Sequence, residues 1–353
     1  MYPKVSLLWV NYNSSGFKNI IKDSIESIKG LDYPNFEFIA VDGGSTDDSP
    51  NFIEGLLKKS KINNYKFIRQ KENLGLHSSW NIAYSSMSNP KYFMLLNNDV
   101  KIYPNAVREF VERLEQDEKI GALNGIEIQW GSKLIANTGA VFDEIFTVNI
   151  LSKNIQVENC EKNEHFISVA SAAISMFRTS ALKKLGEPLL EENMFRHFNE
   201  TILSARLWNA GYKVMFTPIK AGEHHTKLIK ESKSLKRFYY SLRGWLTLLF
   251  MSNSPYKNSI FKDTFLLKQL VYPLIKDLKN YKELIRFYKD VSKDAKQKAD
   301  GLLKRKIFID IYKIPHIRGF RYYWLFPRSL TKIIQPSLRF RDLRKSLYIP
   351  KIE

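Results

Sequence analysis

Short apolar runs alternate with stretches of helical spacing over the first 120 residues. Four apolar runs predict buried strands, at residues 5–10, 36–41, 65–68 and 92–96. Between and after them, apolar residues recur every three to four positions, which predicts helices at residues 23–28, 51–58, 78–86 and 106–114. Strands that alternate with helices in this way indicate βαβ units. We therefore predict an α/β fold with a mostly parallel central sheet flanked by helices.

The pattern becomes less regular after residue 120 and changes character after residue 226. Strands are predicted at residues 126–129, 141–142 and 214–216, the last of them stopped by Pro218, and helices at residues 180–185 and 200–209. Beyond residue 226 the chain has long helical patterns rich in Lys, Tyr, Phe and Leu. We predict two domains, residues 1–226 and a basic, mainly helical region at residues 227–353.

Charge is distributed unevenly between these two parts. The whole chain has a net charge of +19. Residues 1–226 hold 25 basic and 26 acidic side chains, whereas residues 227–353 hold 30 basic and 10 acidic ones. Basic amphipathic helices with interleaved aromatic residues suit an anionic membrane surface. A solvated helical domain with a basic exterior is the alternative interpretation, and nucleic-acid binding is a third and less favoured one.

The remaining composition points to a reducing compartment. Cys160 is the only cysteine, which excludes an internal disulfide bond and fits a buried or incidental thiol. The first residues lack a signal-peptide cleavage site, and no stretch of about 18 uncharged apolar residues occurs. We expect a cytoplasmic protein that is peripheral on the inner face of the cell membrane. The sequence predicts nothing about its oligomeric state.

Polar residues follow three of the predicted strands, near Asn11, Asp42 and Asp99. The carboxyl ends of parallel strands lie at one edge of a sheet, and ligands bind beyond that edge. The turn at residues 41–48 contains Gly43 and Gly44, which allow positive φ and a close backbone approach. The turn is either a well-capped helix start or a nucleoside clamp in which Asp42 accepts hydrogen bonds from a base or ribose.

Residues 97–99 place two amides and one carboxylate, that of Asp99, at a strand end. Such a group is a plausible half-site for Mg²⁺ or Mn²⁺, which take one or two protein carboxylates, with phosphates and water as further ligands. Asn and Asp are also ordinary strand-ending residues. His224 and His225 are adjacent, so at most one of them is expected to bind a metal, and a lone histidine is more often structural.

Glu200 opens a predicted helix that ends at Gly211. A first-turn acid stabilises a helix N-terminus, so Glu200 is either a helix-stabilising residue or a general base.

These segments together resemble the family 2 glycosyltransferases of the GT-A fold, especially the rhamnosyltransferase-like branch. Residues 41–47 (VDGGSTD) resemble the V-D-N-G-S-T-D signature of the family, and residues 96–100 (LNNDV) resemble its D-x-D-type metal motif with only the last carboxylate retained. The other matching segments are residues 10–13, 73–75, 81, 171–178, 206–213 and 237–243. The resemblance covers residues 4–245.

The resemblance implies an inverting transfer of sugar from a nucleotide-diphospho-sugar to a polysaccharide, glycan or lipid-linked hydroxyl acceptor. It implies that Glu200 is the catalytic base and that Mg²⁺ or Mn²⁺ is held by Asp99 with His224 or His225. The implied donor-nucleotide residues are Asn11, Tyr12, Asn13, Asp42, Ser45, Asn73, Gly75, Asn81 and Asn98. The implied acceptor-side residues are Ser171, Ala172, Asn199 and Arg206.

The chain departs from the family pattern at several of these positions. Gly43 replaces the usual Asn, Glu200 replaces the catalytic Asp, and Asn199 replaces the preceding Glu. A catalytically degenerate homologue that acts as a membrane- or nucleic-acid-associated binding protein is therefore the alternative function. A nucleotidyltransferase is disfavoured because the first strand is not followed by a Gly-rich basic loop.

Overall fold

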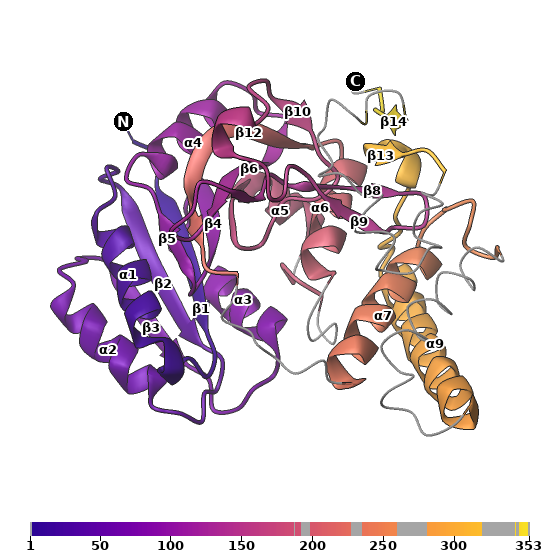
Figure 1. Cartoon of the computed structure of the whole chain (residues 1–353), viewed down its shortest axis with the longest axis horizontal. Coiled ribbons are helices and arrows are strands. Elements are labelled where there is room, and N and C mark those ends of the chain that lie inside the picture. The colour runs from indigo at the N-terminus through magenta and orange to yellow at the C-terminus, as the bar shows by residue number, and fades with distance from the viewer. Residues whose placement is uncertain are drawn as a thin grey trace.

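The computed structural model describes residues 2–186, 188–191, 198–226, 235–259, 281–319, 343 and 346–351. The strands are β1 (Val5–Asn11), β2 (Phe36–Asp42), β3 (Tyr65–Arg69), β4 (Tyr92–Asn97), β5 (Val100–Ile102), β6 (Ile120–Gln129), β7 (Ile135–Asn137), β8 (Ala140–Asp143), β9 (Val148–Ile150), β10 (His165–Phe166), β11 (Ile174–Arg178), β12 (Lys213–His224), β13 (His316–Ile317) and β14 (Leu347–Tyr348) (Figure 1). The helices are α1 (Lys18–Lys29), α2 (Ser49–Lys59), α3 (Leu76–Ser85), α4 (Ala106–Glu115), α5 (Thr179–Leu185), α6 (Asn199–Asn209), α7 (Leu235–Phe250) and α9 (Tyr281–Lys304). Short 3₁₀ helices are η1 (Ser15–Phe17), η2 (Val157–Asn159) and η3 (Ile311–Lys313).

The main sheet is mixed rather than all parallel. Its strand order is β10-β12-β6-β11-β4-β1-β2-β3, with β5 paired to β12 and β7 paired to β6. Strands β4, β1, β2 and β3 are parallel to one another, and β6 is parallel to β12. Strand β11 lies antiparallel between β4 and β6, so it separates the two parallel parts. The predicted α/β fold is confirmed, and its all-parallel half is the first 97 residues.

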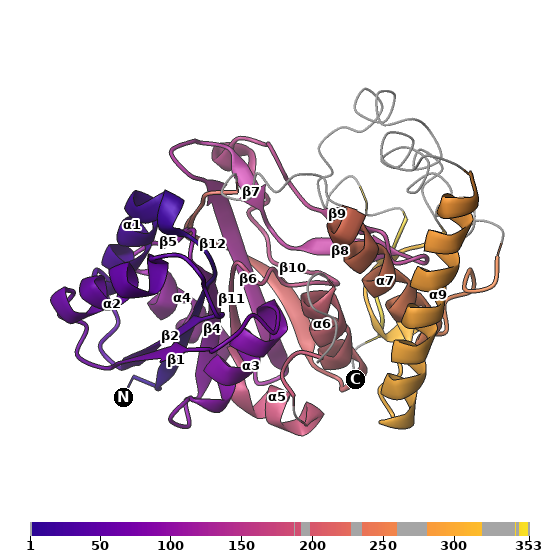
Figure 2. The same cartoon turned by 90° about the horizontal axis from the view of Figure 1, so that it is seen from below.

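The strands are continuous apolar runs because both faces of the sheet are covered by helices. In β1, Leu7 and Trp9 belong to the core on the side of α1, α2 and α4, whereas Leu8 and Val10 belong to the core on the side of α3, α5, α6 and α7. This alternation follows from the two-residue period of a strand. Figure 2 shows the helices on the two sides of the sheet.

The prediction that Pro218 stops a strand is wrong. Strand β12 runs through Pro218 to His224, and its register against β6 shifts between Phe216 and Lys220. Pro has no N–H to donate to a strand partner, so a bulge absorbs the residue and the strand continues. This continuation carries His224 to the edge of the sheet where Asp99 lies.

The described residues on the two sides of the predicted boundary at 226 share a sheet and a core. Strand β13 pairs in parallel with β8, and the Trp245 indole donates a hydrogen bond to the Ile145 carbonyl at 2.6 Å. Leu246 of α7 and Val291 of α9 belong to the same apolar core as the strands. Besides α7 and α9, the described part of residues 227–353 contains β13 and β14. Of the helices that the structure describes, none is long and apolar enough to cross a bilayer.

Candidate active site

The carboxyl ends of β1, β2 and β4 lie side by side. Strand β1 lies between the other two, with Asn11 opposite Asp42 and Val10 opposite Asn97. Side chains that follow these strand ends therefore meet at one edge of the sheet, as the sequence predicts.

Asn11 connects the three strand ends through its amide group. The amide nitrogen donates to Asp42 Oδ1 at 2.8 Å and to Ser49 Oγ at 3.1 Å, and the amide oxygen accepts from Asn98 Nδ2 at 2.9 Å. Asn11 is 3% exposed. Its central place joins the predicted nucleoside turn to the predicted metal motif.

Asp42 is buried and closes the turn that follows β2. Its Oδ1 accepts from the Ser45 hydroxyl at 2.6 Å, and its Oδ2 accepts from the Ser45 backbone N–H at 2.9 Å. Gly44 has a φ of +77°, and a Cβ on it would lie 2.3 Å from the Glu72 carbonyl carbon. The turn therefore requires glycine at this position.

Residues 12 and 13 form the outer side of this turn. The Asn13 backbone N–H donates to Ser45 Oγ at 2.8 Å, and Asn13 Oδ1 accepts from the Thr46 N–H at 2.8 Å. The Tyr12 ring is 48% exposed. An exposed aromatic ring beside a buried carboxylate is suited to stacking on a flat base.

The loop before α3 packs against the turn that follows β2, where Gly44 lies next to Glu72 and Asn73. Asn73 Oδ1 accepts from the Gly75 N–H at 2.8 Å, and Gly75 has a φ of +95°. The Asn81 amide bonds the Leu190 backbone in both directions, at 3.0 and 2.8 Å. Asn81 thus holds the segment at residues 188–191, and its predicted contact with the donor stays a prediction.

Asp99 and His224 form a pair at the same edge. His224 Nε2 is 3.2 Å from Asp99 Oδ1, and His224 Nδ1 is 3.3 Å from Glu127 Oε2. Burial lowers the pKa of the imidazole, but the hydrogen bonds and charges of Asp99 and Glu127 outweigh it and raise the pKa to about 10. Sequence reasoning missed Glu127, although an acid between Ile126 and Ile128 in a strand is a signal of a specific partner.

The donor set of this pair fits a divalent cation that is completed by the substrate. Asp99 supplies a carboxylate oxygen and His224 an imidazole nitrogen, from two different strand ends. Within the described ranges no three His, Cys, Asp or Glu side chains are grouped as a full protein cation site. Diphosphate oxygens and water would therefore provide the other ligands.

His225 takes a different place from His224. Its backbone N–H donates to the Asp99 carbonyl at 2.8 Å, and its ring packs edge-on against Trp130 with centroids 5.9 Å apart. Of the two histidines, His224 is the one beside the Asp99 carboxylate, and the expectation that at most one of them binds a metal stays a prediction.

Glu200 lies in the first turn of α6, directly after Phe198 and Asn199, where Phe198 has a φ of +67°. Burial raises the pKa of the Glu200 carboxyl. Ser204, four residues later and so on the same helix face, accepts a hydrogen bond from the Ala170 N–H at 3.2 Å. The face of α6 that carries Glu200 therefore points toward the segment at residues 170–173.

That segment connects α6 to the metal motif. The Ala173 carbonyl accepts from the Asn97 N–H at 3.1 Å, and the Ser171 N–H donates to Asn124 Oδ1 at 2.7 Å. Ala172 lies between them and is half-buried. Asn124 is fully buried and was missed by sequence reasoning. Residues 170–173 thus contact both the end of β4, two residues before Asp99, and α6, four residues after Glu200, and the meeting of Asp99 and Glu200 at one site stays a prediction.

Asn199 and Arg206 are both mostly buried on α6. Arg206 Nη1 is 2.9 Å from Glu191 Oε1, and its Nη2 donates to the Leu185 carbonyl at 2.7 Å. The guanidinium is thereby committed to contacts within the protein. The acceptor-side roles of both residues stay predictions.

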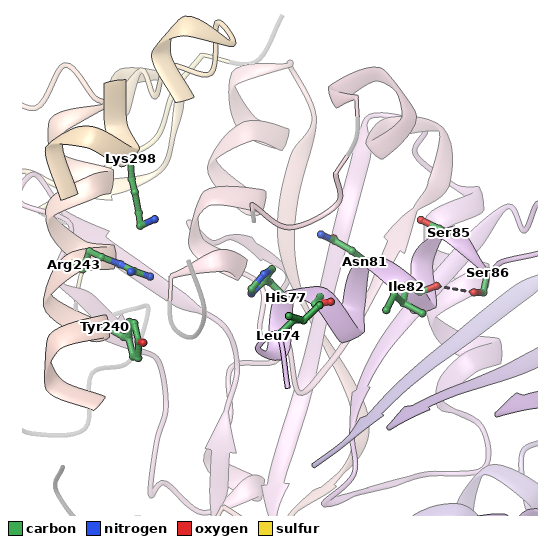
Figure 3. Close-up of a pocket in the computed structure, with 10 residues that line it drawn as sticks. Leu74, His77, Asn81, Ile82, Ser85, Ser86, Tyr240, Arg243 and Lys298 are labelled. Carbon is green, nitrogen blue, oxygen red and sulfur yellow. Dashed lines mark hydrogen bonds between the residues drawn. The ribbon is translucent and has the colours of Figure 1, made fainter. Parts of the chain in front are cut away.

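A cavity of about 690 Å³ lies between α3 and the pair α7 and α9. Figure 3 shows Arg243 and Lys298 pointing across it toward His77 and Asn81. Asp294 anchors both cations, at 3.1 Å from Arg243 and 3.7 Å from Lys298. Leu74 also lines the cavity, so the cavity adjoins the loop that supports the Gly44 turn.

Two solved structures share the fold of this chain. GalNAc-T7 with UDP, GalNAc and Mn²⁺ superposes with a TM-score of 0.60 at 14% identity and covers 86% of this chain and 58% of that chain. Residues 1–349 of Staphylococcus aureus TarS in complex with UDP-GlcNAc give a TM-score of 0.53 at 16% identity. This match covers 85% of this chain and 83% of the TarS chain. This likeness confirms the predicted GT-A fold.

Curated relatives match by sequence. The poly-beta-1,6-N-acetyl-D-glucosamine synthase of Staphylococcus epidermidis is 26% identical over 182 residues, which are 52% of this chain and 41% of the relative. The synthase of the same name from Staphylococcus aureus strain MSSA476 is 23% identical over 215 residues, 61% and 48% of the two chains. The chain thus spans about half the length of these relatives. The rhamnosyltransferase-like branch stays a prediction, because these relatives carry another name.

The family profile named "Glycosyl transferase family 2" matches residues 6–186. This match covers more than half of the chain and includes the β1, β2 and β4 strand ends described above. The chain therefore belongs to glycosyl transferase family 2.

Proposed function

We propose that the protein is a metal-dependent, inverting glycosyltransferase that moves a sugar from a nucleotide-diphospho-sugar to a hydroxyl group of a glycan or lipid-linked acceptor. The observation that carries the proposal is the linked set of side chains at one sheet edge. Asn11 bonds both Asp42 of the nucleoside turn and Asn98 of the motif that contains Asp99, and Asp99 lies 3.2 Å from His224. Such a set matches a ligand with a nucleoside at one end and a diphosphate at the other.

In this proposal the nucleoside binds against the turn after β2. Asp42 accepts hydrogen bonds from the base or ribose, and Tyr12 stacks on the base. UDP-GlcNAc is the first donor to test, because the TarS structure contains it, GalNAc-T7 contains UDP, and the curated relatives are named for an N-acetylglucosamine polymer.

Asp99 and His224 would hold the cation. We favour Mn²⁺ over Mg²⁺ because Mg²⁺ takes oxygen ligands almost exclusively, whereas this pair includes an imidazole. The bound cation would neutralise charge that develops on the departing diphosphate. Residues 170–173 bond both Asn97, at the end of β4, and Ser204 of α6, which supports a position for that diphosphate within reach of α6.

Glu200 would act as the general base. In the step, the acceptor hydroxyl gives its proton to the Glu200 carboxylate while its oxygen bonds the anomeric carbon. The bond from that carbon to the diphosphate oxygen breaks at the same time, and the nucleoside diphosphate leaves with the electron pair. The raised pKa of the partly buried Glu200 carboxyl makes its carboxylate a stronger base than an exposed one.

The acceptor would reach this centre along the cavity between α3 and α7. Arg243 and Lys298 line this cavity and both pair with Asp294, so cationic side chains form part of its wall. An acceptor with phosphate or other anionic groups suits this wall. The predicted division at residue 226 then separates a donor-binding part from a region that supplies this wall.

Donor binding tests the proposal first. Thermal unfolding should be measured with UDP-GlcNAc, UDP-GalNAc, GDP-mannose and dTDP-rhamnose, each with and without Mn²⁺. We expect a UDP-sugar to raise the midpoint only with Mn²⁺, since a ligand at about 100 times its Kd adds about 2.7 kcal/mol. Stabilisation by none of the nucleotides would contradict the proposal.

Two variants then separate binding from transfer. Asp99→Ala should abolish Mn²⁺-dependent donor binding in calorimetry. Glu200→Gln should bind the donor as the wild type does and lose about 10²–10⁴-fold in transfer rate. Glu109→Gln, which changes another first-turn glutamate, in α4, is the matched control and should transfer normally. Full turnover by Glu200→Gln would remove Glu200 from the reaction.

A further inference from the structure

Glu127 occupies an unusual place for a carboxylate. Its side chain is 1% exposed near the carboxyl end of β6, between the buried residues Ile126 and Ile128. Of its two oxygens, Oε2 faces His224 Nδ1 at 3.3 Å. Oε1 is buried and has no hydrogen-bond partner in the part of the chain that the structure describes. Burying a carboxylate with one oxygen unsatisfied is costly, so an apolar residue here would give a more stable strand.

The backbone around Glu127 directs it to His224. Strand β12 lies between β5 and β6, with His224 opposite Val100 on one side and Gln129 on the other. A Cβ on Gly222 would lie 2.3 Å from the Lys101 carbonyl oxygen, so only glycine allows β12 to approach β5 this closely. This approach sets His224 next to Asp99, and β6 brings Glu127 to the other ring nitrogen.

The two contacts have different chemical consequences for the imidazole. A ring that donates its Nδ1–H to a carboxylate can offer its Nε2 lone pair to a metal that replaces the Nε2 proton, and the carboxylate also increases the basicity of that nitrogen. Here Nδ1 faces Glu127, and Nε2 faces Asp99 Oδ1 at 3.2 Å. The ring is therefore held in the orientation that a shared cation between Nε2 and Asp99 requires.

We propose that Glu127 is a positioning residue that holds His224 as an Nε2 ligand of a divalent cation. The inference rests on the proposed metal-dependent function and adds to it a residue that does not touch the cation or the substrate. It gives the buried carboxylate in β6 a role, because Glu127 would increase the affinity for the cation although its burial lowers the stability of the fold.

The test measures Mn²⁺ affinity in the presence of UDP, by the electron paramagnetic resonance signal of free Mn²⁺. Wild type is compared with Glu127→Gln and Glu127→Leu. Loss of a partner of this kind weakens metal binding by about 10–100-fold, and we expect this for Glu127→Leu. Glu127→Gln keeps an acceptor for Nδ1–H without the charge, so its affinity should lie between the other two. This ranking would not follow from a purely structural role.

Glu223→Gln is the matched control. Glu223 precedes His224 in β12 but faces away from it, toward the Tyr103 hydroxyl and the Gly131 N–H. Its loss of charge should leave Mn²⁺ affinity unchanged. Circular dichroism without metal checks that each variant folds, and where Glu127→Leu does not fold, Glu127→Gln decides the outcome.

The results distinguish the inference from the proposed function. A wild-type protein that binds UDP without any Mn²⁺ dependence would refute the metal-dependent function itself. A wild type that binds Mn²⁺, together with a folded Glu127→Leu variant of equal affinity, would overturn the role of Glu127 alone. In the absence of folded Glu127→Leu, equal affinity of Glu127→Gln and wild type would overturn it.

Discussion

At the scale of single residues, the turn after β2 depends on Gly44. An alanine there would adopt a left-handed φ of +77° and place its Cβ 2.3 Å from the Glu72 carbonyl carbon. The left-handed conformation alone costs roughly 1–2 kcal/mol, and the clash adds to it. We expect Gly44→Ala to lower the free energy of unfolding by about 3 kcal/mol in urea titrations and to weaken nucleotide binding.

Gly55 supplies the control for this substitution. It lies within α2, and a Cβ there would meet no atom within 4 Å. Gly55→Ala should therefore stabilise the protein by about 0.5–1 kcal/mol, because alanine favours helix. A Gly44→Ala variant as stable as Gly55→Ala would show that the turn tolerates a side chain.

Asp143 predicts a pH dependence of stability. It is fully buried at the end of β8, and this burial, only partly offset by hydrogen bonds from Thr147 and Ile145, raises its pKa from 3.8 to about 6. Between pH 4 and pH 6 the folded state binds the Asp143 proton more tightly than the unfolded state does. The contribution of Asp143 to the free energy of unfolding therefore falls as the pH rises. The full effect is about 3 kcal/mol.

Asp143→Asn should remove this dependence. The difference in unfolding free energy between wild type and variant should change by about 3 kcal/mol from pH 3 to pH 7, in the direction of relatively lower wild-type stability at pH 7. Asp117→Asn should show the opposite sign. Burial raises the pKa of Asp117, but hydrogen bonds from Lys213 and the Lys119 N–H outweigh it and lower the pKa. A flat difference curve for Asp143→Asn would contradict the assignment.

At the scale of elements, the first half of the fold was readable from the sequence and much of the second half was not. Strands β1 to β4 are parallel and covered on both faces, so their apolar runs and the intervening helical spacing are unambiguous. Strand β11 has no counterpart among the strands that the sequence predicts, because nothing local indicates that its partners are β4 and β6. Pairings between distant segments are decided by tertiary packing and not by pattern.

The candidate site also contains residues that the sequence predicts and residues that it does not. Asn11, Asp42 and Asp99 follow strands directly, so sheet geometry alone predicts their meeting. Glu127 and Asn124 lie within β6, and their roles depend on the register of β6 against β12 and on the approach of residues 170–173. That register includes the bulge after Phe216, which a sequence pattern does not reveal. The position of Glu200 likewise depends on how α6 packs.

One ion cluster joins α6 to the end of α9. Glu191 is 2% exposed and accepts from Arg206 at 2.9 Å and from Arg305 at 2.6 Å. Removing one partner of a buried pair leaves the other charge uncompensated, at a cost of about 3–5 kcal/mol. We expect this loss for Glu191→Leu in urea unfolding, because Arg206 is 7% exposed and would remain charged.

Two further variants test whether the uncompensated charge of Arg206 causes this loss of stability. Glu54→Leu removes a carboxylate that bridges Lys58 and Arg69 at the surface, and its unfolding midpoint should stay near that of wild type. The double variant Glu191→Leu with Arg206→Met removes both buried charges and should recover most of the stability. A double variant as unstable as Glu191→Leu would indicate lost packing and not an uncompensated charge.

At the scale of the whole molecule, part of the excess positive charge of residues 227–353 lies on the outer face of α9. Helix α9 uses its apolar face within the protein, where Val291, Ala295, Ala299 and Leu302 are buried. Its outer face is exposed and basic, at Lys282, Arg286, Lys289, Lys293, Lys296 and Lys304. Among the side chains of α9 that the structure describes, Leu303 is the exposed large apolar one, so the helix offers little apolar surface to a bilayer. If the protein binds anionic membranes, as its sequence predicts, we expect α9 to contribute mainly through charge, about 1 kcal/mol for each well-placed cation.

Charge reversal tests this contribution. Lys289→Glu, Lys293→Glu and Lys296→Glu combined should abolish sedimentation with vesicles that contain phosphatidylserine, and about 1 M NaCl should release the wild type because it shortens the screening length to about 3 Å. The matched control reverses Lys22, Lys29 and Lys59 on α1 and α2, at the opposite end of the molecule from α9 (Figure 1), with the same change in net charge. Equal loss of vesicle binding by both triple variants would show that net charge, and not α9, drives the binding. Equal binding of the wild type to neutral phosphatidylcholine vesicles would show that the attraction is not electrostatic.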